Sequence, residues 1–255
     1  MYDQNKCVLC KRCVSLCAKA CHSIKEGEHI FSRNDCIACG ECLSPLCEAL
    51  TLSGKEVLAS EVLTEVLKDS IFYKTSRGGL TLSGGEPLAQ SDFCVEILRL
   101  AKEKGLHTCI ETCGYASKEA IIQSAEYTDL YLFDIKETDK DLHVNFTGVG
   151  NKQILENLSL LNNLGKDIVL RCPLIPNFNC RDEHLIEIAK IANSLDRVIG
   201  IEIEPYHELG ISKYERLGQK YSLGSKAMPV EYYTRYVELL KNHTGKPVKI
   251  LEQKL

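Results

Sequence analysis

The stretch Leu82-Ser83-Gly84-Gly85-Glu86-Pro87 joins a short apolar segment, Gly79–Leu82, to the amphipathic helix that follows it. Two adjacent glycines let the backbone turn sharply and leave no Cβ between the main chain and a ligand. Glu86 adds a carboxylate just past the apolar segment, at the edge where parallel α/β folds bind ligands. The stretch is therefore either an ordinary turn or a site for a cation such as an amino acid's ammonium group.

Strand and helix patterns alternate from this turn onward. Apolar segments predict strands at Gly79–Leu82, His107–Glu111, Leu130–Ile135, Ile168–Leu174 and Val198–Glu204, and a short last strand at Val248–Leu251. Amphipathic segments predict helices at Ser60–Tyr73, Ser91–Lys104, Ser117–Tyr127, Lys152–Leu164, Asp182–Leu195 and Val230–Asn242. The first five strands start about 22 to 40 residues apart, a spacing typical of βα units. The pattern predicts an α/β domain with a parallel sheet or barrel over residues 55–255.

Polar side chains gather where these strands end. In parallel α/β folds, such ends converge on the ligand site. An exposed ion pair between Asp134 and Lys136, or a hydrogen-bonded loop role for His207, would explain single members of the group. All of them together are more polar than a structural rim requires, which predicts a ligand site. The group consists of Glu86, Glu111, Asp134, Lys136, Arg171 and His207.

The front of the chain holds nine of its fourteen cysteines, within the first 47 residues. Eight of them form two runs, and Cys21 is an extra one; the runs are Cys7-x2-Cys10-x2-Cys13-x3-Cys17 and Cys36-x2-Cys39-x2-Cys42-x4-Cys47. The first spacing is that of bacterial two-cluster ferredoxins, where three thiolates of a run bind one iron–sulfur cube and the fourth binds the other. Residues 1–54 are therefore predicted to form a ferredoxin-like module.

The spacing also assigns the ligands of two [4Fe–4S] clusters. One set is Cys7, Cys10, Cys13 and Cys47, and the other is Cys36, Cys39, Cys42 and Cys17. The runs depart from the usual pattern because no proline follows the fourth cysteine and the second run is one residue longer. Cys21 could also take the place of Cys17. A pair of zinc knuckles is the alternative, although such sites use two cysteines per knuckle.

The remaining composition excludes several classes of protein. The net charge is −4 and no basic block occurs, so nothing favours nucleic-acid binding. No apolar run reaches the ~18 residues that span a membrane. The N-terminus MYDQNKCVLC has no apolar core of a secretory signal. These features predict a cytoplasmic protein, in which crowded cysteines bind metal rather than form disulfides.

Several segments together resemble the glycyl-radical-enzyme activating enzymes of the radical S-adenosylmethionine (SAM) superfamily. They are LTLSGGEPL, IETCGY, LFDIKETD, HVNFTGVGNKQILEN, RCPLIP and EPYHELGISKYERLG. The resemblance runs from about Cys7 to Tyr221, and the cysteine runs resemble the insert of activases that serve dehydratases and decarboxylases. It implies a partial (β/α) barrel in which a reduced [4Fe–4S] cluster cleaves SAM. The resulting 5′-deoxyadenosyl radical takes a hydrogen atom from a glycine of the partner enzyme.

The resemblance also implies roles for individual residues. Gly84, Gly85 and Glu86 bind the amino group of the SAM methionine, and Asp134-Ile135-Lys136 contacts SAM further along the sheet. Arg171 and His207 complete the pocket, while Glu111 and Asp134 line a site for a monovalent cation. The two N-terminal clusters are implied to relay electrons from a reductant such as flavodoxin or ferredoxin, under anaerobic conditions. The implied partner is a glycyl radical enzyme of the dehydratase or decarboxylase type.

The family's C-x3-C-x2-C motif is absent from these 255 residues, so we assign no catalytic residue. In the family this motif precedes the cysteine insert on the loop after the first strand, and a full-length relative carries a third cluster there. Five barrel strands are therefore expected instead of six, with Gly79–Leu82 at an exposed edge. Three explanations stay open. The chain is a truncated activase, an electron-transfer protein without SAM cleavage, or a module that docks on a glycyl radical enzyme.

Overall fold

The chain is divided into two compact units. The computed structural model describes residues 1–44, 46–221, 223–224 and 226–251. Unit 1 combines Met1–Glu56 with His207–Gly224, and unit 2 combines Val57–Tyr206 with Ser225–Leu255. The predicted module boundary at residue 54 lies two residues before the end of the first segment of unit 1. No sequence pattern had indicated that residues 207–224 belong with the cysteine-rich front.

Unit 2 contains a sheet of six parallel strands in the order β3-β4-β5-β6-β7-β8. They are β3 (Gly79–Leu82), β4 (His107–Thr112), β5 (Leu130–Asp134), β6 (Asp167–Leu174), β7 (Val198–Pro205) and β8 (Val248–Ile250). All predicted strands are confirmed to within one residue at either end. The expectation of only five strands in the sheet was wrong, because β8 pairs with β7. As expected, β3 lies at one edge.

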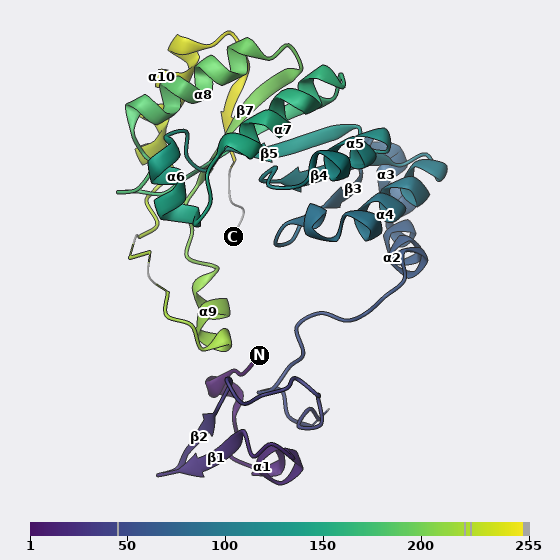
Figure 1. Cartoon of the computed structure of the whole chain (residues 1–255), viewed down its shortest axis with the longest axis vertical. Coiled ribbons are helices and arrows are strands. Elements are labelled where there is room, and N and C mark those ends of the chain that lie inside the picture. The colour runs from purple at the N-terminus through teal and green to yellow at the C-terminus, as the bar shows by residue number, and fades with distance from the viewer. Residues whose placement is uncertain (45, 222, 225, 252–255) are drawn as a thin grey trace. The chain divides into compact units, whose positions relative to one another are not determined.

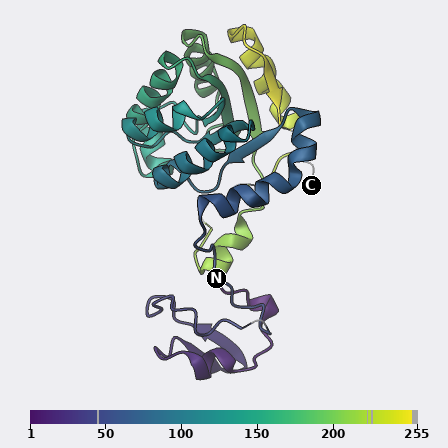
Figure 2. The same cartoon turned by 90° about the vertical axis from the view of Figure 1, so that its right-hand side faces the viewer.

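Helices cover one face of this sheet, and both views show the strands as a curved wall with its helices outside (Figures 1 and 2). They are α2 (Ala59–Val66), α3 (Ser70–Ser76), α4 (Ser91–Glu103), α5 (Lys118–Glu126), α6 (Lys140–Thr147), α7 (Lys152–Asn163), α8 (Asp182–Ser194) and α10 (Glu231–His243). Single 3-10 turns lie at η2 (Leu67–Asp69) and η3 (Pro87–Gln90). The helix predicted over Ser60–Tyr73 is therefore divided at η2, and α6 was not predicted.

Alternation along the strands separates an apolar face from a polar one. The apolar core between sheet and helices includes Tyr131, Phe133, Leu170 and Ile201, all fully buried. The residues between them in sequence point to the opposite face. In register across β5, β6 and β7, that face carries Asp134, Arg171 and Glu202. The sheet therefore presents charged groups on the side away from its helices, near the carboxyl ends of its strands.

Unit 1 is built from short elements around a small core of Tyr2, Ala49 and Leu50. Its elements are η1 (Gln4–Lys6), α1 (Arg12–Leu16), the antiparallel hairpin β1 (His22–Lys25) and β2 (Glu28–Phe31), and α9 (Ile211–Leu217). Arg216 of α9 ties the two segments together: its carbonyl accepts from the Tyr2 N–H at 3.0 Å, and its guanidinium donates to Thr51 Oγ1 at 3.1 Å. Among the described residues, none of the helices combines the length and apolar character needed to cross a membrane.

Candidate functional site

The turn at Gly84-Gly85 leaves open space beside its backbone. Gly84 has φ +134°, a conformation that residues with a side chain rarely adopt. Gly85 is not in that region, yet a Cβ built on either glycine would meet nothing within 4 Å. Neither backbone strain nor steric crowding therefore explains why a glycine stands at position 85. The glycine leaves open space beside the main chain that a side chain would occupy.

The Glu86 carboxylate is oriented by the end of the neighbouring strand β4. Its Oε1 accepts from Thr112 Oγ1 at 2.8 Å and from the Leu88 N–H at 3.1 Å. Its Oε2 accepts from the Cys113 N–H at 2.9 Å and from the Cys113 thiol at 3.1 Å. Thr112 and Cys113 had not been predicted as site residues. The signal was available, because adjacent parallel strands end at the same edge.

Asp134 and Lys136 form an ion pair at the end of β5, with Lys136 Nζ 3.0 Å from Asp134 Oδ2. The other oxygen, Asp134 Oδ1, is buried and accepts no hydrogen bond from the part of the chain that the structure describes. A buried acceptor without a donor costs about 1–3 kcal/mol, so this oxygen is suited to a ligand donor. Ile135 differs, because its side chain is buried in the core and its N–H donates to the Arg171 carbonyl.

Lys136 keeps its positive charge in this setting. Burial acts to lower its pKa, but the carboxylate of Asp134 and the nearby groups of Cys113 and Glu204 raise the pKa above its ordinary value. Cys113 thus contacts Glu86 and also acts electrostatically on Lys136. The ends of β3, β4 and β5 therefore contribute to one site, which holds an ordered carboxylate, an ion pair and an unpaired acceptor.

Arg171 lies at the centre of a cluster of glutamates and is only 8% exposed. Its guanidinium is 2.6 Å from Glu111 Oε1 and 3.0 Å from Glu204 Oε1, and its Nε is 3.7 Å from Glu202 Oε2. Burial acts to lower the pKa of Arg171, but these carboxylates and Asp134 raise it. Glu111 is therefore already paired with the Arg171 guanidinium. Of the two residues that the resemblance implies for a cation site, Asp134 is the one that keeps an oxygen without a hydrogen-bond donor among the described residues.

Glu202 and Glu204 had not been predicted as part of the site. The alternation Ile201-Glu202-Ile203-Glu204 carries the signal, since the isoleucines are buried in the core and the glutamates face Arg171. Lys249 of β8 also belongs to the cluster, with its Nζ 2.8 Å from Glu202 Oε1. A sequence interpretation that treated Val198–Glu204 as a strand alone missed this polar face.

A buried polar network holds the loop that follows Lys136. Asn179 donates from Nδ2 to the carbonyls of Lys136 (2.8 Å) and Pro173 (2.7 Å). The fully buried Glu137 carboxylate pairs with Arg181 at 2.6 Å and accepts the N–H of Thr138 at 2.9 Å. Because moving the loop would leave these buried groups unpaired, the network fixes the position of Lys136.

His184 completes this network and makes it sensitive to acid. Its Nδ1 accepts from the Thr138 N–H at 3.2 Å, and burial lowers the pKa of His184 to about 4 despite the nearby Glu137 carboxylate. The unfolded chain, with a histidine pKa near 6.5, binds a proton first as the pH falls, so acid favours unfolding. We expect the free energy of unfolding to fall by about 2 kcal/mol between pH 7 and pH 5 from this residue alone.

Urea unfolding at the two pH values measures this effect. His184→Gln removes the titrating group, so this variant should lose the corresponding part of the pH dependence. His107→Gln, at an exposed position, should keep the pH dependence of the parent chain. Equal pH dependence in the parent chain and His184→Gln would show that His184 is not held neutral by the fold.

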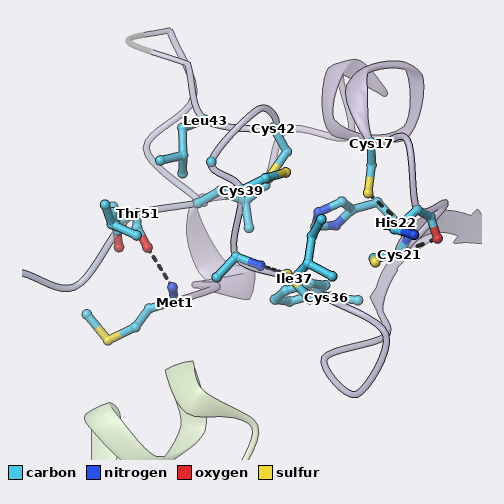
Figure 3. Close-up of a pocket in the computed structure, with 16 residues that line it drawn as sticks. Met1, Cys17, Cys21, His22, Cys36, Ile37, Cys39, Cys42, Leu43 and Thr51 are labelled. Carbon is cyan, nitrogen blue, oxygen red and sulfur yellow. Dashed lines mark hydrogen bonds between the residues drawn. The ribbon is translucent and has the colours of Figure 1, made fainter.

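The cysteines of unit 1 line two separate cavities. Cys7, Cys10, Cys13 and Cys47 line one, together with Tyr2 and His29. Cys17, Cys36, Cys39 and Cys42 line the other, together with Cys21 and His22 (Figure 3). Each cavity thus contains one of the two sets that the spacing assigned to a cluster. Backbone N–H groups contact the sulfurs, as from Ala38 to Cys36 and from Cys21 to Cys17, both at 3.4 Å. Four thiols with N–H donors around a cavity fit an iron–sulfur cluster.

His207, the last residue predicted to contact SAM, opens the second segment of unit 1. Its Nδ1 accepts a hydrogen bond from the Leu209 N–H at 3.3 Å. This local contact is the one expected of a loop histidine. Its role toward SAM stays a prediction.

Comparison with known proteins identifies the family of the chain. Residues 48–191 match the model of the Radical SAM superfamily. The chain is 37% identical over 230 residues to the choline trimethylamine-lyase activating enzyme of Oleidesulfovibrio alaskensis, covering 88% of this chain and 74% of that protein. It is 37% identical over 225 residues to the trans-4-hydroxy-L-proline dehydratase activating enzyme of Clostridioides difficile, with 87% and 74% coverage.

A solved structure shares the fold. A domain of a pyruvate-formate lyase-activating enzyme from Bacteroides vulgatus superimposes with a TM-score of 0.58 at 26% identity, covering 69% of this chain and 99% of that domain. The parallel sheet of six strands is consistent with the partial (β/α) barrel of such proteins. The chain belongs to the radical SAM superfamily and, within it, to the activating enzymes of glycyl radical enzymes.

Proposed function

We propose that this chain binds SAM at the ends of β3, β4 and β5 in order to generate a glycyl radical on a partner enzyme. The Glu86 carboxylate carries the proposal, because Thr112 and Cys113 hold both of its oxygens beside the open Gly84-Gly85 backbone. A carboxylate fixed in this way accepts the ammonium group of the SAM methionine. A reduced [4Fe–4S] cluster held by a C-x3-C-x2-C segment, which these 255 residues do not contain, would supply the electron for SAM cleavage.

The other side chains of the site bind and orient SAM. Asp134 offers its unpaired Oδ1 to a donor of SAM, and Lys136, which stays cationic, offers N–H donors to an acceptor. Arg171 holds Glu111 and Glu204 in place and so shapes the polar face beyond them. Asp134 is the group that would bind a monovalent cation, while Glu111 already has a cationic partner. His207 is proposed to contact SAM as well.

The proposed partner is a glycyl radical enzyme of the lyase or dehydratase type. This proposal is supported by the relatives, which include activating enzymes of choline trimethylamine-lyase and of trans-4-hydroxy-L-proline dehydratase. A small electron carrier such as flavodoxin or ferredoxin is the proposed reductant, in an anaerobic cytoplasm. The test is a glycyl-radical electron paramagnetic resonance signal on such a partner after anaerobic incubation with SAM and a reduced activase to which a C-x3-C-x2-C segment has been joined. If the activase cleaves SAM but the partner enzyme shows no radical signal, the proposed partner is excluded.

The two cavities of unit 1 are proposed to bind [4Fe–4S] clusters that transfer electrons. Anaerobic reconstitution should load about eight irons per chain, four for each cluster. Cys10→Ala and Cys39→Ala should each lose about four irons, because each removes a ligand from one cavity. Cys94→Ala, a buried core thiol in unit 2, should lose none. Iron and sulfide analysis measures this, and stoichiometric zinc in place of iron would contradict it.

A further inference from the structure

Two histidines face each other across the hairpin of unit 1. His22 of β1 pairs with Phe31 of β2, and Ile24 pairs with His29, so both imidazoles lie on the same face as diagonal neighbours. Their rings stack at 5.1 Å with an interplanar angle of 17°. Phe31 stacks on His22 at 4.5 Å, and Tyr2 packs edge-on against His29 at 4.6 Å. These aromatic contacts fix the orientation of both imidazoles.

One nitrogen of this pair touches a predicted cluster ligand. His29 Nε2 is 3.3 Å from Cys13 Sγ and 3.1 Å from His22 Nδ1. A thiolate that binds iron has no hydrogen, so His29 Nε2 carries the hydrogen of this contact. The same N–H also donates to His22 Nδ1, so the hydrogen bond from His29 is bifurcated. Neutral His22 therefore carries its own hydrogen on Nε2.

That second N–H is a buried donor in need of an acceptor. His22 is 3% exposed, and its Nε2 has no hydrogen-bond partner within residues 1–44, 46–221, 223–224 and 226–251. His22 lines the cavity of Cys17, Cys36, Cys39 and Cys42, whereas His29 lines the cavity of Cys7, Cys10, Cys13 and Cys47. The close-up of the former cavity shows His22 among the labelled cysteines (Figure 3). A sulfur of a cluster in this cavity would satisfy the orphaned donor.

We propose that His22 and His29 form a hydrogen-bonded bridge between the two cluster cavities, and that their N–H donors raise the reduction potentials of both clusters. This inference rests on the proposed cluster binding. An N–H donor to a cluster sulfur stabilises negative charge, and the reduced cluster carries one more electron than the oxidised one. The donor therefore favours the reduced state. His29 acts on the cluster held by Cys13, and His22 acts on the other cluster.

Single-cluster chains separate the two effects. In a Cys39→Ala background, which keeps the cluster of Cys13, His29→Phe retains a ring against Tyr2 but removes the donor. At a fixed potential we expect the ratio of reduced to oxidised cluster to fall about tenfold, a shift of about 59 mV for one electron. His29→Gln, which keeps an N–H donor, should recover most of this loss. His22→Phe should have the corresponding effect in a Cys10→Ala background.

A potentiometric titration followed by electron paramagnetic resonance measures these shifts, with the exposed His107→Phe as the matched control. In the full chain labelled with ¹⁵N-histidine, the reduced cluster should also show a nitrogen coupling that His29→Phe removes. Unchanged potentials and couplings in chains that hold their iron would overturn the bridge while leaving cluster binding intact. Chains that bind no iron would instead overturn the proposed clusters.

Binding of a single metal ion is the alternative to the hydrogen-bonded bridge between the two histidines. Ligand atoms of Cys13, His22 and His29 all lie within 4.8 Å of one another, a set that zinc could bind. One equivalent of zinc that persists after iron loading and is lost in His22→Phe would contradict the bridge. Iron near eight per chain without zinc supports it.

Discussion

Reduced anaerobically with SAM, the 255-residue polypeptide is expected to release no 5′-deoxyadenosine. Reductive cleavage needs an iron with an open coordination position, which a cluster held by three cysteines provides. The eight thiols of the two runs form two sets of four, each around its own cavity, so a cluster proposed for either cavity would be closed by four thiolates. No C-x3-C-x2-C motif occurs in the printed sequence to hold a third cluster. Chromatographic assay of 5′-deoxyadenosine over several hours measures the outcome.

An extended polypeptide is the positive control. Joining a C-x3-C-x2-C segment to the front, from in-frame coding sequence upstream or from an activase relative, should raise iron from about eight to about twelve per chain. It should also switch SAM cleavage on. Turnover by the 255 residues themselves would show that another thiol builds an open cluster. Cys21 is the first candidate, since it shares the cavity of Cys17 and is 3% exposed.

Loss of SAM binding is the second large effect, and it is expected from changes at the turn after β3. Gly85→Val places a branched side chain in the open space beside the backbone without imposing a strained φ, so it should abolish measurable binding. Glu86→Gln removes the charge that accepts the ammonium group. A charge-assisted hydrogen bond contributes about 1.5–3 kcal/mol, so affinity should fall about 10- to 150-fold. Isothermal calorimetry with the iron-loaded protein measures both losses.

Matched variants test whether these effects are local. Gly245→Val makes the same change at another glycine with open space and ordinary φ, in the loop between α10 and β8. Glu119→Gln removes an exposed carboxylate from α5. Both should bind SAM like the parent chain. If Gly85→Val and Glu86→Gln also retain the parent affinity, the Gly84-Gly85-Glu86 turn is not part of the SAM site.

The strands and the two cysteine sets could be predicted because both depend on short-range sequence patterns. The strands were placed to within one residue because apolar runs of four to eight residues alternate with helices. The cysteines could be divided into two sets because thiolates with two residues between them share one tight loop. Glu202 and Glu204 were missed although their alternation with Ile201 and Ile203 was visible. The isoleucines predicted the strand, and the glutamates between them form its second, charged face.

Other features depend on contacts far apart in the sequence. Nothing in residues 207–224 shows that Arg216 bonds to Tyr2 and Thr51, about 165 to 214 positions earlier. The pairing of Glu111 with Arg171 likewise follows from the order of the strands and from the reach of a glutamate. Sequence spacing alone placed both residues at strand ends, but not in contact.

The interleaving of the two units has a consequence for synthesis on the ribosome. The nine cysteines of residues 7–47 are translated before α9, whose Arg216 supports Tyr2 and Thr51 and which follows about 150 residues after Glu56. At 5–20 residues per second this delay is about 8–30 s. During that interval the thiols are made but their unit is incomplete. If iron–sulfur clusters are loaded before Gly224 emerges from the ribosome, they are loaded into a nascent chain that still lacks α9. A fragment cut after Glu56 would lack this supporting helix permanently.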